Sequence, residues 1–436
     1  MELFADLRLT EGPVYWAAWL LGSAGALYLL WGRPKDPPLR RLIRPLAAGA
    51  AALSVVAIAH WAVVDVLSLL PDDVPSPVLF WVGIPVTAAI LLLMRVGRET
   101  WRRRAAGGTA FALVLLLSMV QVNSYFGLNR TLSDLFGAST AGVSRLEPDL
   151  TRQADAPPLV PLAGWHPEGA IPGQGELRTA SIPGTASGMN NRDAYIYLPP
   201  AYFAPNRPAL PVLLLIAGQP GGPADWLTGG SLQSHMDSFA AAHGGLAPVV
   251  VVADPNGSQS GNTMCMDSRI AKADTYLSQD VPRWITSTLA VDPDHRQWAA
   301  GGFSFGATCA VQLGTRHPDL YKAVLAFSSE AEPAIAKERH KTIDASFPGD
   351  PVAFERQTPL AIMAANRFEG SGMYLTAGAE DPEFAGYLRT LAAAAEKSGF
   401  SVQAHVVDGA GHSWDTSSKR FADAMAFLAG RWGLGS

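Results

Sequence analysis

The chain has 436 residues, more than one ordinary domain needs, and this length predicts two or three folding units. Hydrophobic residues make up 48% of the chain and charged residues only 16%, a balance typical of a protein that lies partly in lipid. The formal net charge of −5 argues against a nucleic-acid-binding protein, which would need a concentrated basic face. The 2 cysteines are too few for a disulfide framework or a four-ligand zinc site.

Four apolar runs near the N-terminus are each about as long as a membrane-spanning helix. They cover Pro13–Trp31, Pro45–Leu70, Pro77–Met94 and Ala105–Leu128. A helix of about 20 apolar residues crosses the ~30 Å hydrocarbon core of a bilayer. A signal peptide would have a shorter apolar core and would leave three further runs unexplained. The sequence therefore predicts a four-span transmembrane anchor over residues 1–130.

The loops between these runs predict how the anchor is oriented. Basic residues gather in the first and third loops: Arg33, Lys35, Arg40, Arg41 and Arg44 in the first, and Arg95, Arg98, Arg102, Arg103 and Arg104 at the third. The second loop, Pro71–Ser76, has two aspartates and no Lys or Arg. By the positive-inside rule the basic loops face the cytoplasm, so the N-terminus and everything after Leu128 should lie outside it. The spans hold few ionisable residues (His60 and Asp65 among them), which favours an anchor over a transporter.

After the anchor the sequence changes character twice. Residues 131–183 lose hydrophobic periodicity and become rich in Pro, Gly and Ala, which predicts a linker. Residues 184–436 alternate between strand and helix patterns. The expected strands are Ala194–Leu198, Val212–Ala217, Val249–Ala253, Trp298–Gly302, Ala323–Phe327, Met373–Thr376 and Val402–Val407. The expected helices are Leu232–Ala242, Tyr276–Leu289, Ala307–Thr315, Phe384–Lys397 and Phe421–Trp432. This alternation predicts an α/β domain with a mostly parallel sheet, helices on both faces, and an active site beyond the carboxyl ends of the strands.

One motif in this region indicates nucleophilic chemistry. Gly302-Phe303-Ser304-Phe305-Gly306 follows an expected strand and opens an expected helix. A sharp strand-to-helix turn with glycines on both sides of a serine exposes its hydroxyl, and the adjoining helix N-terminus favours negative charge. Ser304 is therefore the expected nucleophile. A tight structural turn is the alternative.

A serine nucleophile needs a base, and the base needs an acid that orients it. Among the 9 histidines His412 is the expected base, because it directly follows the last strand. The acid should lie between Ser304 and His412 in the chain. Asp381 is favoured, Glu380 beside it is the alternative, and Glu330 after the preceding strand is a more distant one.

An oxyanion hole needs a second backbone N–H beside that of Phe305. The loop after the strand Val212–Ala217 should supply it, and since Pro220 has no N–H, the donor is Gln219 or Gly221. The cysteines, Cys265 and Cys309, could form one disulfide if their domain lies outside the cytoplasm, or remain two buried thiols.

Several stretches together resemble a known family. Tyr195-Ile-Tyr-Leu-Pro-Pro200, Gly302-Phe-Ser-Phe-Gly-Ala307 and Gly411-His-Ser-Trp414 are similar to the esterase group of the α/β-hydrolase fold that includes esterase D, feruloyl esterases and mycolyltransferases. Asn262-Thr-Met-Cys-Met-Asp267, with Tyr276-Leu-Ser-Gln-Asp280 and Cys309, looks closest to actinobacterial membrane-anchored esterases of that group. There are departures: Ala307 stands where many members have a second glycine, and Ala217-Gly218 replaces their His-Gly.

The resemblance implies cleavage of carboxyl esters through an acyl-enzyme, with no metal or organic cofactor. With the anchor, it predicts a serine esterase at the outer face of the cell membrane that acts on a lipid ester such as aminoacyl-phosphatidylglycerol. An acyltransferase of the mycolyltransferase kind would use the same residues. A membrane-tethered binding module without catalysis is the alternative of another class.

Overall fold

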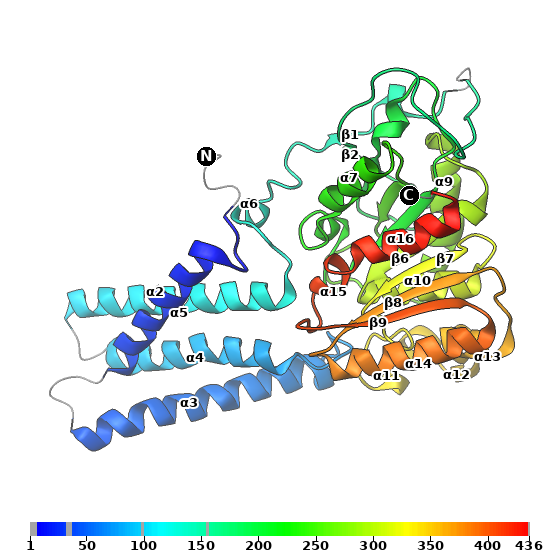
Figure 1. Ribbon diagram of the computed structural model, residues 1–436. Coiled ribbons are helices and arrows are strands. Elements are labelled where there is room, and N and C mark those ends of the chain that lie inside the picture. The colour runs from blue at the N-terminus through cyan, green and yellow to red at the C-terminus, as the bar shows by residue number, and fades with distance from the viewer. Residues whose placement is uncertain (1–6, 32–36, 97–99, 154–156, 435–436) are drawn as a thin grey trace. The chain divides into compact units, whose positions relative to one another are not determined.

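The computed structural model describes residues 7–31, 37–96, 100–153 and 157–434 (Figure 1). It divides into two compact units. The first contains Met1–Ala138 and Ile335–Lys341, and the second contains Ser139–Ala334 and Thr342–Ser436. Of the basic loop residues, Arg33, Lys35 and Arg98 lie outside the described residues.

The first unit consists mainly of four long helices. They are α2 (Gly12–Leu30), α3 (Pro38–Trp61, continued by the π-helical turn η1, Ala62–Val66), α4 (Ser76–Val96) and α5 (Trp101–Phe126), with a short α6 (Leu132–Leu135) after them. All four long helices are long and apolar enough to cross a membrane. Only 17% to 39% of the residues in their most apolar windows are buried, so most of their apolar side chains face outward.

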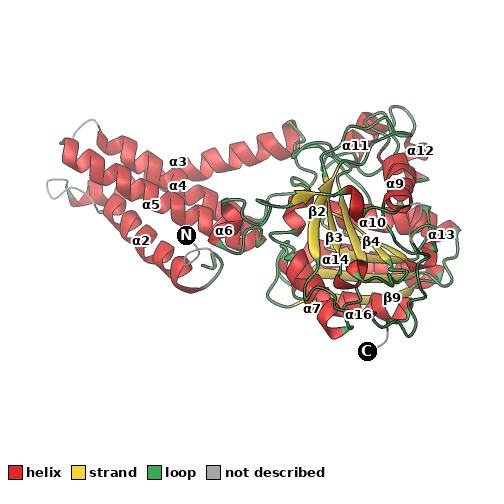
Figure 2. Cartoon of the chain, turned by 90° about the horizontal axis from the view of Figure 1, so that it is seen from above, coloured by secondary structure: helices red, strands yellow, loops and turns green. Residues whose placement is uncertain are grey.

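Small residues and one arginine hold these helices together. Helix α5 packs against α2 and α4, and α3 packs against α4 (Figure 2). A Cβ added at Gly25 would lie 2.6 Å from the carbonyl oxygen of Ala110, so α2 and α5 touch backbone to backbone. The buried Arg95 guanidinium donates to the carbonyls of Tyr28 (3.1 Å) and Leu29 (2.7 Å) at the end of α2. Those carbonyls have no intrahelical partner, so Arg95 caps a neighbouring helix.

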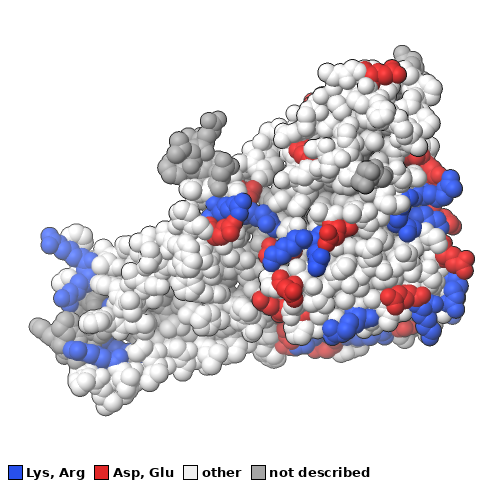
Figure 3. All heavy atoms as spheres, viewed as in Figure 1, with Lys and Arg blue, Asp and Glu red and all other residues white. Residues whose placement is uncertain are grey.

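Charged side chains are distributed unevenly over the first unit. Figure 3 shows basic side chains gathered at the end that carries the loops between α2 and α3 and between α4 and α5, next to a broad surface without charge. The basic residues that flank these loops among the described residues are Arg40, Arg41, Arg44, Arg95, Arg102, Arg103 and Arg104.

The second unit is built on a nine-stranded sheet in the order β1-β2-β3-β5-β4-β6-β7-β8-β9. The strands are β1 (Ser144–Arg145), β2 (Glu176–Ala180), β3 (Ala194–Leu198), β4 (Val212–Ile216), β5 (Val249–Ala253), β6 (Trp298–Phe303), β7 (Ala323–Phe327), β8 (Gly372–Gly378) and β9 (Ser401–Val407). In the sheet order from β5 to β9, all neighbouring strands pair in parallel. Strand β3 pairs antiparallel with both of its neighbours, β2 and β5. The mostly parallel sheet confirms the expected fold class. Every residue of β4 to β8 is buried, which explains why these strands read as continuous apolar runs.

Helices cover both faces of this sheet (Figures 1 and 2). They are α7 (Leu232–Ala242), α8 (Ala273–Thr275), η5 (Tyr276–Asp280), α9 (Val281–Thr288), α10 (Phe305–Arg316), α11 (Arg339–Ser346), α12 (Pro351–Glu355), α13 (Pro359–Ala365), α14 (Pro382–Ser398), α15 (Asp415–Ser418) and α16 (Phe421–Trp432). Helix α10 is buried from Phe305 to Thr315 and packs on β6 and β7. The helix that follows β6 is therefore held in place by packing along almost its whole length.

The segment expected as a linker differs in the structure. Residues 139–183 belong to the second unit, and they supply β1 and β2, the two outermost strands on one side of the sheet. Each residue of β2 is only partly buried, and its sequence Glu-Leu-Arg-Thr-Ala carries no apolar run. A strand of this kind has no hydrophobic signature in the sequence.

Candidate active site

Ser304 stands at the sharp turn between β6 and α10. Its backbone has φ 55° and ψ −122°, a strained conformation for a residue with a side chain. The flanking glycines are required by close approach. A Cβ at Gly302 would lie 2.2 Å from the carbonyl carbon of Gly306, and one at Gly306 would lie 2.1 Å from the carbonyl oxygen of Ile216. The turn thus presents the hydroxyl of Ser304 at the carboxyl end of β6.

His412 lies in the loop between β9 and α15, directly against this serine. Its Nε2 is 2.8 Å from Ser304 Oγ. Two rings hold the imidazole, with centroids 4.1 Å away at Phe384 and 5.4 Å away at Phe303. The serine hydroxyl and the imidazole are therefore within hydrogen-bond distance without any rearrangement.

The carboxylate nearest to this histidine is that of Asp381. Its Oδ2 lies 3.2 Å from His412 Nδ1, close enough for an ion pair, although the angle is outside that of a well-aligned hydrogen bond. Its Oδ1 accepts from the N–H of Phe384 and caps α14. The other two candidates lie elsewhere: the side chain of Glu380 is exposed, and Glu330 accepts a hydrogen bond from the Thr308 hydroxyl (2.9 Å).

The loop after β4 borders the serine, as an oxyanion loop must. A Cβ added at Gly218 would lie 3.5 Å from the Cβ of Ser304. Gly221 is wrong as the second donor, because its N–H donates to the carbonyl oxygen of Gln259 at 2.9 Å. Within the described part of the chain, the N–H groups of Gln219 and Phe305 have no protein hydrogen-bond partner. The Gln219 N–H therefore stays a candidate for the second oxyanion donor, whereas the N–H of Gly221 is already engaged.

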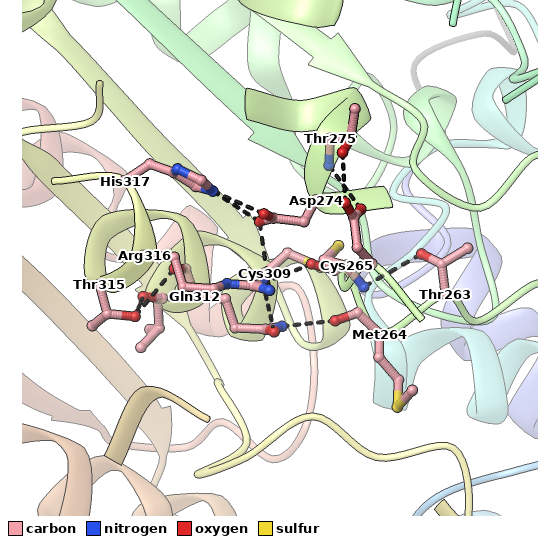
Figure 4. A network of polar contacts seen from close by, with 12 residues as sticks. Thr263, Met264, Cys265, Asp274, Thr275, Cys309, Gln312, Thr315, Arg316 and His317 are labelled. Atoms are coloured by element: carbon pink, nitrogen blue, oxygen red, sulfur yellow. Dashed lines mark hydrogen bonds and ion pairs between the residues drawn. A yellow bond between two sulfur atoms is a disulfide. The ribbon is translucent and has the colours of Figure 1, made fainter. Parts of the chain in front are cut away.

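A disulfide and a polar network attach the loop after β5 to α10, the helix that follows Ser304 (Figure 4). Cys265 is bonded to Cys309, one turn along α10 from Ser304. Further along the same helix, Gln312 donates to the carbonyl of Met264 (2.8 Å) and Arg316 to that of Cys265 (2.7 Å).

The network continues to the end of α10 through an ion pair. Asp274 lies 2.9 Å from Nε2 of His317 and 3.5 Å from the guanidinium of Arg316. Burial by itself would raise the pKa of Asp274, but the hydrogen bond from His317 and the charge of Arg316 outweigh it and lower that pKa. The loop is thus fixed to the helix covalently and electrostatically.

Sequence reasoning missed a residue that contacts this candidate oxyanion loop, Arg192, and the carboxylate that holds it, Asp254. Arg192 donates to the carbonyl oxygen of Gly221 (2.9 Å), and Asp254 holds the same guanidinium at 2.7 Å. They lie 62 positions apart and fit no motif, so only the fold brings them together. Among the described residues, no three His, Cys, Asp or Glu side chains are grouped so that they could hold a metal ion.

The mostly parallel sheet, the elbow at Ser304 and the histidine after the last strand define a protein of the α/β-hydrolase class. Residues 186–428 match the model of the family described as "Putative esterase". The chain belongs to this esterase family, and it is an ester hydrolase.

The chain is also similar to individual known proteins. The chain is 32% identical, over 391 residues and 86% of each chain, to a protein of Corynebacterium glutamicum that is itself named as uncharacterized. Among solved structures it is similar to a ferulic acid esterase (TM-score 0.52, 19% identity, 60% of this chain and 99% of the other). It is also similar to an S-formylglutathione hydrolase from Agrobacterium tumefaciens (TM-score 0.51, 16% identity, 62% and 100%). At these identities the two structures support the fold alone.

Proposed function

We propose that Ser304, His412 and Asp381 form a catalytic triad that cleaves carboxyl esters through an acyl-enzyme. The observation that carries the proposal is the 2.8 Å contact between Ser304 Oγ and His412 Nε2, with Asp381 3.2 Å from the other ring nitrogen. A neutral serine is a weak nucleophile, and an adjacent imidazole oriented by a carboxylate is the established way to activate it.

The proposed reaction has two halves that use the same groups. His412 Nε2 takes the proton of Ser304 as Oγ bonds to the ester carbonyl carbon, and it then gives that proton to the departing alkoxide. Water then attacks the acyl-enzyme, loses its proton to His412, and releases the acid as Ser304 regains the proton. In both halves the tetrahedral oxyanion accepts hydrogen bonds from the N–H groups of Phe305 and Gln219, where the positive end of α10 adds to the stabilisation.

The substrate that fits the whole chain best is a lipid ester at the outer face of the membrane, such as aminoacyl-phosphatidylglycerol. Four apolar helices would hold the hydrolase beside the bilayer. The basic residues at one end of that unit favour that end as the cytoplasmic one. The Cys265–Cys309 disulfide supports an oxidising location for the hydrolase.

Activity can be tested on the full chain in detergent. Wild-type protein should hydrolyse p-nitrophenyl butyrate and react with a fluorophosphonate probe, and Ser304→Ala should lose both. Ser258→Ala, at an exposed serine, is the matched control and should keep both. A folded wild-type protein that neither reacts nor hydrolyses would favour the binding module instead.

Substrate and sidedness need separate experiments. Vesicles that contain lysyl-phosphatidylglycerol should release free lysine with wild type but not with Ser304→Ala. Transfer of the acyl group to an added alcohol in place of water would indicate an acyltransferase. In intact cells a membrane-impermeant maleimide should label Ser258→Cys but not Arg102→Cys, which flanks a loop expected in the cytoplasm. The reverse labelling would contradict the proposed orientation.

A further inference from the structure

The oxyanion loop is held on both sides of a single residue, Gly221. Its N–H donates to the carbonyl of Gln259, and its own carbonyl accepts from Nη2 of Arg192, both at 2.9 Å. The next residue is fixed as well, because the N–H of Gly222 donates to Asp225 Oδ2 at 2.9 Å. The proposed oxyanion donor, Gln219, lies only two residues before Gly221. Its backbone position is therefore coupled to these contacts.

Arg192 is itself fixed by a buried carboxylate. Its Nε and Nη2 meet the two oxygens of Asp254 at 2.7 and 3.0 Å, and its backbone N–H donates to the same group at 3.0 Å. Asp254 directly follows β5, is 2% exposed, and accepts from the N–H groups of Asn256 and Gly257. A bidentate arginine–carboxylate pair with so many supporting hydrogen bonds is rigid. Arg192 thus links the loop, through Gly221, to Asp254 at the end of β5.

We propose that Arg192, held by Asp254, is a positioning residue for the oxyanion hole: it places Gly221 and, through it, the N–H of Gln219. The inference rests on the proposed esterase function and deepens it. Preorganised donors stabilise charge only where they already point at the position that the oxyanion will occupy, and a displacement of about 1 Å can cost 10²-fold in rate. Among the described residues Arg192 makes no hydrogen bond or ion pair with Ser304 or His412, so its proposed effect is exerted through the loop.

A positioning role differs measurably from a merely structural one. If Arg192 acts through the oxyanion hole, its loss weakens binding of the tetrahedral state and leaves binding of the ground-state ester nearly unchanged. The rate of the chemical step then falls while KM stays close to its wild-type value. An inhibitor that forms a tetrahedral adduct with the serine, such as an alkyl trifluoromethyl ketone, should weaken in proportion.

The experiment uses the full chain in detergent with Arg192→Lys, which keeps the charge but cannot hold Asp254 bidentately and reach Gly221 as well. We expect kcat for p-nitrophenyl butyrate to fall about 10- to 100-fold with KM changed less than about threefold. The Ki of the trifluoromethyl ketone should rise by the same factor as kcat/KM falls. The matched control is Arg145→Lys, because Arg145 pairs with Asp193 on the exposed surface, and it should stay within about twofold of wild type.

A second variant reaches the same contact from the loop. A Cβ at Gly222 would lie 2.6 Å from Nη1 of Arg192, so Gly222→Ala displaces the guanidinium without removing any charge. The φ of Gly222 is −172°, an extended conformation that alanine adopts readily. The kcat of Gly222→Ala should therefore fall, as expected for Arg192→Lys.

Two results would overturn the inference: unchanged kcat and Ki in Arg192→Lys, or a loss that lies in KM alone. A failure of the proposed function is distinct, because it would appear in wild type compared with Ser304→Ala before any Arg192 variant is made.

Discussion

The two units of this chain differ in where they place large apolar side chains: the first exposes many of them, and the second buries most of them. Among the described residues, the large apolar side chains that are exposed lie in the four-helix unit, except for Ile270, Val352 and Val406. In the second unit, every residue of the central strands is buried. An exposed apolar surface of that extent is stable only against an apolar solvent or a partner.

The polar groups follow the same contrast. In the four-helix unit a buried arginine satisfies carbonyls at a helix end, and small residues let the helices touch. In the second unit partly buried polar groups converge on Ser304 and on the loop beside it. This contrast is the basis on which we propose that the second unit carries out the chemistry and that the first contacts lipid. Variants in either unit can test this division of roles.

The largest effect is expected at the carboxylate of the proposed triad. Asp381→Asn should lower kcat by about 10²- to 10⁴-fold, because an amide no longer stabilises the charged imidazole or selects its tautomer. Glu380→Gln, one position earlier and exposed, is the matched control and should change kcat less than about twofold. Steady-state hydrolysis of p-nitrophenyl butyrate measures both. A larger loss in Glu380→Gln than in Asp381→Asn would move the role to Glu380.

Removing the disulfide should destabilise the second unit without changing the first. Cys265 and Cys309 are separated by 44 positions, and opening a loop of this size costs about 2–4 kcal/mol of stability. Urea titration of Cys265→Ala with Cys309→Ala, followed by residual esterase activity and pulse proteolysis, measures the change. Each single variant should lose nearly as much as the double, since either one removes the bond. Losses that add up across the two single variants would instead indicate cavities at two independent sites.

A bulky residue between α2 and α5 should give the converse result. Gly25→Leu forces apart two backbones that now touch, and overpacking of this kind costs about 1–3 kcal/mol. Gly49→Leu is the matched control, because an added Cβ there meets nothing within 4 Å. Thermal unfolding of the detergent-solubilised chain should shift for Gly25→Leu alone, with kcat for a soluble ester unchanged below the transition. A fall in kcat at low temperature would mean that the chemistry depends on the helix packing.

The elements that the sequence predicts correctly are mostly those whose residues are buried in the fold. The strands β3, β5 and β7 have the bounds that their apolar runs predict. Helices α11 to α13 were not predicted, since their segments are short, and the first of them, Arg339–Ser346, has no clear apolar stripe. The outermost strands β1 and β2 were missed for the related reason that exposed or half-buried strands carry mixed residues.

The site shows the same division between local and long-range information. Ser304 and His412 could be proposed because each lies in a short motif at the end of a strand. The hydrogen bond from the Gly221 N–H to Gln259 could not be predicted, since it joins the loop after β4 to the loop after β5. The ion pair between Arg192 and Asp254 likewise depends on the antiparallel pairing of β3 with β5, which no local sequence pattern predicts.

The smallest expected effect tests whether the segment before β2 is a structured part of the second unit. Glu147 meets Nε of Arg178 at 2.6 Å, and this hydrogen bond chiefly lowers the pKa of Glu147. A carboxylate whose folded pKa is lowered stabilises the fold above its unfolded pKa near 4.5, and this stabilisation is lost as the pH falls through the lower folded value. Glu147→Gln should thus lower the melting temperature at pH 7 by about 1 °C or less, since the Glu147 side chain is 43% exposed to solvent.

That difference should vanish once the pH has fallen below the lowered folded pKa of Glu147, because the wild-type carboxyl is then protonated too. Scanning fluorimetry between pH 3 and pH 7 can follow it, with Glu168→Gln at an exposed position as the control. A difference between Glu147→Gln and wild type that stays constant over the whole pH range would show that the ion pair with Arg178 is not its source. Equal melting temperatures at every pH would mean that the segment contributes no measurable stability, as a true linker would.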